Sequence, residues 1–150
     1  MRVKVSRRIN APASGIWPLI GDYSNINRIH PLLKGSHFIE GTQSCEVGST
    51  RQCDMKNGDY IKERVIEWEE GSHYTVDVYE TSMPVKDAVA TFGVRELSKN
   101  QSEAYLDFTM NLKYAVLQPI MYLVFKYIAG TGILRKLEKE YFAATQVSLA

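Results

Sequence analysis

The chain has 150 residues, of which 45% are hydrophobic and 23% are charged, a composition typical of one ordinary globular domain. Its 18 basic and 17 acidic side chains nearly balance, which excludes the strongly basic character of most nucleic-acid-binding domains. We therefore expect a single domain over residues 1–150 and no nucleic-acid partner.

The first fifth of the chain predicts a strand followed by two short helices. Residues 3–9 alternate apolar and polar side chains, which is the period of a strand. Pro12 and Ser14 then suit the start of a short helix. A second short helical turn follows at residues 25–29 and ends before Pro31, because the residue before a proline avoids helical angles.

The remainder of the chain predicts a sheet and one long helix. Residues 36–114 indicate six further antiparallel strands separated by turn-forming residues, which makes seven strands in total. Pro119 suits the first turn of a long C-terminal helix, in which Gly130 and Gly132 are expected to allow a kink. The helical period predicts a sheet-facing stripe of Ile120, Leu123, Val124, Tyr127, Leu134, Leu137 and Tyr141.

The segment DMKNGDY decides the register of one hairpin. A two-residue Asn57-Gly58 turn would place Arg51 opposite Arg64, whereas a three-residue loop ending in a left-handed Gly58 places Arg51 opposite Glu63. Facing like charges destabilise a strand pair, and facing opposite charges contribute about 0.2–1 kcal/mol. We therefore predict that Arg51 and Glu63 pair on the apolar face of this hairpin.

The same reasoning extends the register across the neighbouring strands. The further predicted facing pairs are Val65–Val76, Glu63–Val78, Glu67–Tyr74, Val94–Ala104, Phe92–Leu106 and Ala90–Phe108. The inner face of the sheet is then apolar and aromatic around one ion pair. We expect the long C-terminal helix to cover this face.

Several motifs resemble a known family. They are INAPASGIWPLIGDYSNINRIHPLLKGS, VGSTRQC and NGDYIKERVIEWEEGSHYTVDVYE, and together with the element order they cover nearly the whole chain. The sequence resembles the polyketide cyclase/dehydrase-like branch of the START-like superfamily, which has the helix-grip fold of birch pollen allergen type proteins. The resemblance implies an α+β fold in which a curved seven-stranded antiparallel sheet wraps around a long C-terminal helix. It also implies a cavity between them for lipids, sterols, polyketides, hormones or other apolar molecules.

Arg51 and Glu63 form the sharpest candidate site. Burial of an ion pair does not by itself favour folding, because both charges lose their water. The pair therefore indicates either a polar point in the cavity, where a ligand carboxylate, hydroxyl or carbonyl would meet Arg51, or a structural ion pair. Other residues expected on the inner face, and predicted to contact a ligand, are Tyr74, Phe92, Phe108, Met110, Leu112, Tyr114, Leu123 and Tyr127.

The remaining polar and aromatic candidates favour structural roles. His30 is interpreted as a residue that packs at a bend, with a general base at the cavity mouth as the alternative. Trp17 is predicted to lie in the core. No residue is assigned a catalytic role, and the spacing of the three histidines predicts no metal site. We expect neither a metal nor another cofactor.

The two cysteines indicate a reducing compartment. Cys45 and Cys53 lie eight residues apart, and the N-terminal residues MRVKVSRRIN do not resemble a secretory signal. We interpret both as free thiols of a cytoplasmic protein, while a disulfide remains geometrically conceivable.

The segment AVLQPIMYLVFKYIAGTGIL is apolar almost all round. We do not predict a transmembrane segment, because Gln118, Lys126 and the glycines interrupt the run of about 20 apolar residues that a membrane span needs. Residues off the sheet-facing stripe are expected to form a homodimer contact, cover a cavity opening or touch a membrane transiently; they are Met121, Tyr122, Phe125 and Ile128.

Three functions stay open at this point. The favoured one is binding or transport of a small hydrophobic or amphipathic molecule without covalent chemistry. The second is a cyclase, aromatase or dehydratase that folds a reactive chain in the same cavity. The third is an interaction module that forms homodimers through the apolar helix.

Overall fold

The computed structural model describes residues 1–42 and 44–149. One seven-stranded antiparallel sheet has the order β1-β7-β6-β5-β4-β3-β2. The strands are β1 (Arg2–Ile9), β2 (Leu33–Phe38), β3 (Thr50–Met55), β4 (Tyr60–Glu69), β5 (His73–Thr81), β6 (Val85–Ser98) and β7 (Gln101–Leu112). The helical elements are α1 (Ala13–Ile20), η1 (Tyr23–Arg28), η2 (Ala115–Leu117), α2 (Gln118–Leu123), η3 (Val124–Gly130) and α3 (Thr131–Leu149). The predicted α+β element order is confirmed, and the second short helix is a 3₁₀ helix.

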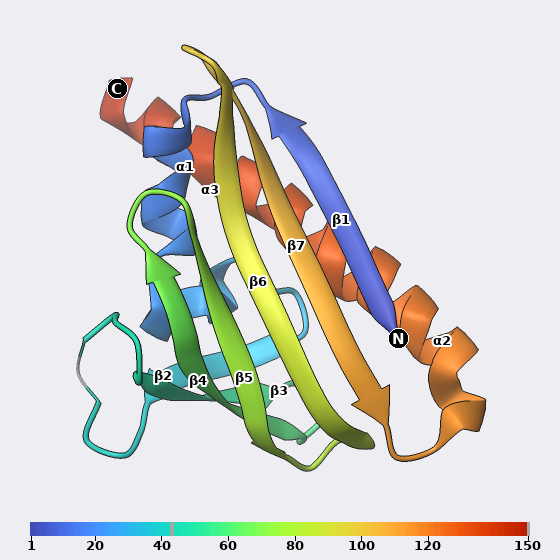
Figure 1. The fold of residues 1–150 in the computed structure, drawn as a ribbon. Coiled ribbons are helices and arrows are strands. Elements are labelled where there is room, and N and C mark those ends of the chain that lie inside the picture. The colour runs from blue at the N-terminus through green and yellow to red at the C-terminus, as the bar shows by residue number, and fades with distance from the viewer. Residues whose placement is uncertain (43, 150) are drawn as a thin grey trace.

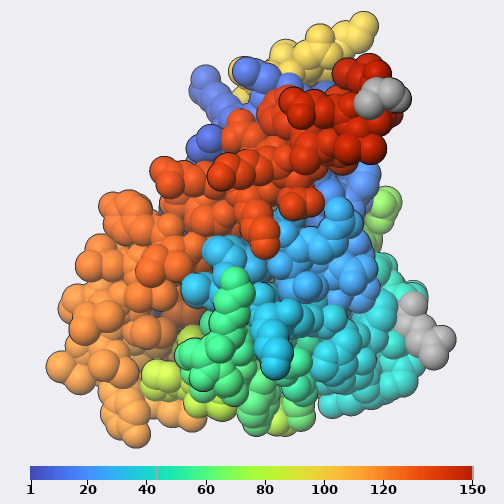
Figure 2. All heavy atoms as spheres, turned by 180° about the vertical axis from the view of Figure 1, so that it is seen from behind, coloured from blue at the N-terminus to red at the C-terminus, as the bar shows by residue number. Residues whose placement is uncertain are grey.

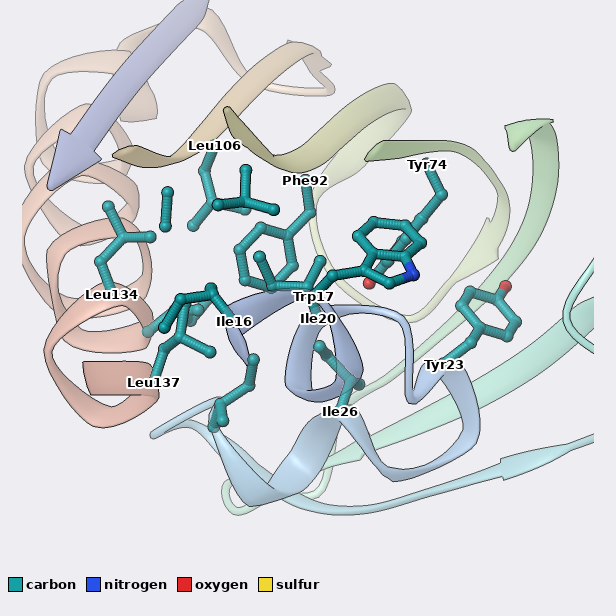
Figure 3. Close-up of a cluster of buried hydrophobic side chains, with 14 of the residues drawn as sticks. Ile16, Trp17, Ile20, Tyr23, Ile26, Tyr74, Phe92, Leu106, Leu134 and Leu137 are labelled. Atoms are coloured by element: carbon teal, nitrogen blue, oxygen red, sulfur yellow. The ribbon is translucent and has the colours of Figure 1, made fainter. Parts of the chain in front are cut away.

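The long helical stretch from η2 to α3 crosses the concave face of the curved sheet (Figure 1). The short helix α1 lies on the same side and contacts both α3 and β6. Figure 3 shows Leu134 and Leu137 of α3 together with Ile16 of α1, and Leu106 of β7 lies opposite them. The expectation that the C-terminal helix covers the apolar face of the sheet is therefore confirmed.

Trp17 fixes α1 to the tip of the β4–β5 hairpin. Its side chain is buried, and its indole Nε1–H donates to Glu70 Oε1 at 2.7 Å. The indole ring also meets Trp68 edge-on at 5.6 Å between ring centroids. The predicted core position of Trp17 is confirmed.

The hairpin register that the charges favoured is confirmed. Arg51 lies opposite Glu63. Gly58 ends the loop between β3 and β4 with φ of 94°, which a residue with a side chain rarely adopts. The other confirmed facing pairs are Val65–Val76, Glu63–Val78, Ala90–Phe108, Phe92–Leu106 and Val94–Ala104.

The predicted pairing of Glu67 with Tyr74 is wrong. Glu67 lies opposite Thr75, and Tyr74 lies opposite Trp68, because the ladder shifts register between Val65 and Glu67. A bulge of this kind places two residues of one strand against one residue of its partner. Counting residues from a turn assumes a regular ladder and misses such a shift.

The N-terminal half of the long helix faces inward through residues other than those predicted. Ile120, Leu123 and Tyr127 have 64%, 54% and 58% of their surface exposed, so their predicted place on the sheet-facing stripe is wrong. Met121 and Phe125 pack against the sheet instead. The reason is that η3 is a π-helix, whose wider turns take more residues than α-helical turns and rotate the preceding residues about the axis.

The C-terminal half of the helix follows the prediction. Leu134 and Leu137 are fully buried, and Tyr141 packs against the same core. At Gly130 the helix approaches β1 closely, since a Cβ there would lie 2.7 Å from Val5 Cγ2. Gly130 therefore serves close packing of the helix against the sheet, and the helix continues through it.

Candidate functional site

A cavity of about 100 Å³ lies between the concave face of the sheet and the helical layer. Its walls come from the strands β3 to β7, and η1, η3 and α3 supply residues on the opposite side. Figure 2 views the molecule from the helical side, where a hollow separates the orange atoms of the helical segment from the blue and green atoms of the η1 and β3–β4 regions. The cavity that the resemblance implied is therefore present, and it is small beside the roughly 300–1,000 Å³ of typical ligand pockets.

Six of the ten residues predicted to contact a ligand line this cavity. They are Arg51, Glu63, Tyr74, Phe92, Phe108 and Met110. Leu112 is buried in the adjoining small cluster with Val85 and Met110. Contact of these residues with a ligand stays a prediction.

Three of the predicted residues lie outside the cavity. Tyr114, Leu123 and Tyr127 have 61%, 54% and 58% of their surface exposed, so their predicted place on an inner face is wrong. The strand β7 ends at Leu112, and its in-and-out alternation does not extend to Tyr114. The π-helical turns of η3 account for the outward position of the other two.

The cavity also contains residues that we did not select from the sequence. The strand registers place five of them on the inner face and could have identified them: Ile61, Val76, Val78, Ala90 and Leu106. Others come from loops and from the helical layer, where the sequence carries no comparable signal; they include Ile26, Met83 and Ile133. Phe125 covers part of the cavity, which is one of the roles expected for residues off the sheet-facing stripe.

Arg51 is held on three sides at one end of the cavity. Its Nε and Nη2 lie 2.7 and 2.6 Å from Glu63 Oε2, and its Nη1 donates to the backbone carbonyl of Tyr23 at 2.6 Å. The guanidinium carbon lies 4.0 Å from the centroid of the Tyr23 ring, a cation–π distance. Only 5% of the Arg51 side chain and 12% of the Glu63 side chain are exposed. These contacts fix the position of the ion pair within the fold.

Arg51 keeps its positive charge, and its uncharged neighbours keep their protons at neutral pH. Burial alone would lower the pKa of Arg51, but the Glu63 carboxylate raises it well above its ordinary value. Burial raises the pKa of the Cys53 thiol to about 12 and that of the Tyr74 phenol to about 12. Cys45 and Cys53 are free thiols, as predicted. Cys53 is consequently not a thiolate nucleophile at pH 7.

His30 lines the cavity and stabilises the bend before β2. Its Nδ1 accepts a hydrogen bond from the Leu32 amide at 3.2 Å, so the neutral ring carries its proton on Nε2. Burial, together with the positive charges of Arg51, Lys136 and Lys56, lowers the pKa of His30 to about 3. His30 is therefore a neutral hydrogen-bond donor at pH 7. The structural interpretation of this histidine is confirmed, and the geometry does not suit a general base.

Comparison with known proteins identifies the family. Residues 1–139 match the family described as polyketide cyclase/dehydrase and lipid transport. The chain belongs to this family. No curated protein matches it significantly. The predicted resemblance to the START-like superfamily is confirmed.

Solved structures share the fold of this polyketide cyclase/dehydrase and lipid transport family member. The Zhui aromatase/cyclase from Streptomyces sp. R1128 is similar with a TM-score of 0.80 at 13% identity, over 94% of this chain and 93% of that one. A START superfamily protein from Mycobacterium smegmatis has a TM-score of 0.78 at 14% identity, over 95% and 98%. XoxI from Bacillus cereus has a TM-score of 0.76 at 22% identity, over 94% and 95%. Identities this low show a common fold and do not transfer an activity.

Proposed function

We propose that this protein binds and carries a small hydrophobic or amphipathic molecule in the cavity between the sheet and the C-terminal helix. The observation that carries the proposal is the lining of the cavity, which is apolar and aromatic except for Thr81 and for the end formed by Arg51, Glu63 and His30. The apolar part would contribute about 25 cal/mol for each Å² of apolar ligand surface that it buries. The polar end would orient the ligand by hydrogen bonds.

The same polar end favours a carrier over the alternative of a cyclase, aromatase or dehydratase. Proton transfer near neutral pH requires a group that can accept a proton. His30 Nδ1 already accepts the Leu32 amide and Glu63 Oε2 already accepts from Arg51, so of these acceptors Glu63 Oε1 alone is unused by the described residues. The groups at this end therefore suit fixed hydrogen bonding to a ligand better than they suit proton transfer.

Nile red, an uncharged dye whose fluorescence rises in apolar surroundings, tests the proposal with a matched pair of variants. Ala90→Phe places a larger side chain in the cavity, whereas Val89→Phe places the same ring on the outer face of β6. We expect the wild type and Val89→Phe to bind the dye alike and Ala90→Phe to bind it at least tenfold more weakly. Circular dichroism verifies that both variants fold. Equal binding by the two variants would contradict a ligand site in this cavity.

We further propose that the outer face of the segment covering the cavity contacts an anionic membrane surface while the ligand is exchanged. By length and composition alone, the helical stretch Ala115–Leu149 could cross a membrane, and little of its most apolar window is buried. Its C-terminal half packs against the sheet, which favours contact with the surface of a bilayer over insertion across it. The exposed apolar residues of the outer face are Val116, Ile120, Leu123, Tyr127 and Ile128.

The charges around this face support a membrane over a second copy of the chain. Between Asp107 and Glu138 the sequence has basic residues but no acidic ones; the basic residues are Lys113, Lys126, Arg135 and Lys136. The Lys126 ammonium lies 5.5 and 5.4 Å from the ring centroids of Tyr122 and Tyr127. Tyrosine and lysine at the edge of an apolar helix face suit an anionic bilayer surface. Two such faces brought together in a homodimer would repel each other.

Co-sedimentation with vesicles of phosphatidylcholine alone or with phosphatidylglycerol tests this contact. The double substitution Ile120→Ser and Leu123→Ser should lower the bound fraction on anionic vesicles several-fold. The matched double substitution Val147→Ser and Leu149→Ser removes two exposed apolar residues near the end of α3 and should leave binding unchanged. Concentration-dependent dimers in sedimentation velocity that Ile120→Ser and Leu123→Ser abolish, without vesicle binding, would instead support the homodimer.

A further inference from the structure

The polar end of the cavity indicates which chemical class of head group a ligand carries. Building on the proposed carrier function, we propose that the cavity selects ligands with an uncharged hydroxyl or phenol head group and disfavours carboxylates. Three observations support this selectivity: the charge balance of the ion pair, the hydrogen-bonding groups that it leaves free, and the lack of any further charged side chain among the described residues that line the cavity.

The first observation is that the positive charge of Arg51 is already matched. Glu63 Oε2 lies within hydrogen-bond distance of both Nε and Nη2 of Arg51, and both side chains are buried. A ligand carboxylate that approached the guanidinium would also approach the Glu63 carboxylate. At short range and with little water between them, the repulsion of the two carboxylates would offset the attraction to Arg51.

The second observation concerns the hydrogen-bonding groups that remain. Arg51 donates its Nε–H to Glu63 and one Nη1–H to the Tyr23 carbonyl, and its Nη2 lies 2.6 Å from Glu63 Oε2, so these contacts use only part of the five N–H donors that a guanidinium possesses. Glu63 Oε1 accepts no hydrogen bond from any of the residues that the structure describes. The Nε2–H of His30 adds a further donor at the same end. A hydroxyl both donates and accepts, so it can satisfy Glu63 Oε1 and one N–H together, whereas a carboxylate offers no proton to Glu63.

The third observation is the composition of the remaining wall. Within the described residues, Arg51 and Glu63 are the charged side chains that line the cavity, and their charges cancel. His30 does not supply a compensating charge, because its Nδ1 is held as an acceptor by the Leu32 amide. A bound carboxylate would therefore leave one uncompensated negative charge in a largely apolar space, which is strongly unfavourable.

Competition between 1-decanol and decanoate for the Nile red site tests the inference at pH 8, where decanoate is ionised. The two molecules have the same chain length and differ in the head group. We expect 1-decanol to displace the dye at a concentration at least tenfold lower than decanoate. In Glu63→Gln the positive charge of Arg51 is unmatched, and we expect the ratio of the two affinities to shift at least tenfold towards decanoate.

Two further variants separate charge from damage to the fold. The double substitution Arg51→Gln and Glu63→Gln removes both charges and should restore the preference for 1-decanol. Glu69→Gln makes the same chemical change at an exposed position of β4 and should leave the ratio unaltered. Circular dichroism verifies folding, and if Glu63→Gln does not fold, the ratio in the wild type decides the question.

The possible failures are distinguishable. Binding of Nile red with equal affinities for 1-decanol and decanoate, or with a preference for decanoate, would overturn the head-group selectivity and leave the carrier function standing. An unchanged ratio in folded Glu63→Gln would overturn the role of charge. A wild-type protein that binds neither the dye nor either decyl compound would contradict the proposed carrier function itself.

Discussion

The two ends of the cavity differ in how firmly the fold holds them. At one end, Arg51 and Glu63 are buried and joined by short hydrogen bonds, and Tyr23 contacts the guanidinium through both its ring and its carbonyl. We call this the fixed end. At the other end, a small cluster around Met110 is covered by Met121 and Phe125, which are only partly buried. We call this the covered end.

This difference indicates that the two ends of the cavity have different roles. Hydrogen bonds between buried groups specify one geometry, which suits recognition of a polar head group. Methionine has a flexible, unbranched side chain that adapts to irregular space. Partly buried side chains also lose fewer packing contacts when they move. Because the cavity measures only about 100 Å³, a larger ligand requires displacement of side chains, and the covered end offers the least resistance. The predictions below test this difference, from the largest expected effect to the smallest.

Removal of one partner of the ion pair should have the largest effect. In Arg51→Ala, Glu63 becomes a buried charge without its partner, and the expected decrease in the free energy of unfolding is about 3–5 kcal/mol. The matched variant is Arg95→Ala, because Arg95 pairs with Glu103 at the surface, with 59% of its side chain exposed. That variant should lose less than about 1 kcal/mol. Urea denaturation measures both free energies of unfolding. Equally small losses would show that the Arg51–Glu63 pair stabilises the fold no more than a surface ion pair.

Two leucines of the C-terminal helix provide the next test. Leu137→Ala should lower the free energy of unfolding by about 2–5 kcal/mol, because Leu137 is fully buried in the main core. Leu123→Ala should change it by no more than about 0.5 kcal/mol, because 54% of Leu123 is exposed. The sheet-facing stripe predicted from the α-helical period contains both leucines and would give large losses at both positions. A large loss for Leu123→Ala in urea denaturation would therefore restore that stripe and contradict the π-helical rotation.

The sequence was sufficient to predict the sheet and the fixed end for identifiable physical reasons. Strand alternation and turn chemistry are local, so the element order follows from short stretches of chain. The choice between two loops of the Asn57–Gly58 turn was decided by charge, and the same choice placed Arg51 beside Glu63. Family resemblance then supplied the cavity, which no local pattern reveals.

The covered end could not be predicted in the same way. An extrapolated α-helical period assigned Leu123 and Tyr127 to the inside. The π-helical turns of η3 instead rotate the residues before them about the helix axis. The bulge between Val65 and Glu67 misplaced a strand pair for the same reason, since one additional residue is invisible to a periodic pattern. His30 accepts the amide of Leu32, a detail that depends on the bend geometry.

The pH dependence of stability tests the neutral state of His30 at the fixed end. Its pKa is about 3 in the folded protein and about 6.5 in an unfolded chain. The unfolded chain therefore binds more protons between these values, so stability is complete above pH 6.5 and decreases as the pH falls towards 3. At pH 5 the contribution of His30 should lower the free energy of unfolding by about 2 kcal/mol relative to pH 8.

Comparison with His30→Asn isolates this contribution from other titrating groups. Asparagine retains a side-chain acceptor close to the Leu32 amide but does not titrate in this range. The difference between wild type and variant in urea unfolding should change by about 2 kcal/mol between pH 8 and pH 5. Parallel pH profiles for the two proteins would show that His30 is readily protonated in the folded state.

The smallest change in stability, combined with a clear change in ligand exchange, is expected at the covered end. Phe125 lines the cavity and its ring centroid lies 6.0 Å from that of Phe108. Because Phe125 is only partly buried, Phe125→Ala should lower the free energy of unfolding by about 1–2 kcal/mol, below the roughly 3–5 kcal/mol for a fully buried phenylalanine. Stopped-flow dilution should show Nile red leaving this variant several-fold faster than the wild type.

The matched variant Tyr122→Ala removes a ring from the outer face of the same segment and should leave the release rate unchanged. Release at the wild-type rate from Phe125→Ala would mean that ligands leave by another route, and that both ends of the cavity are held equally firmly.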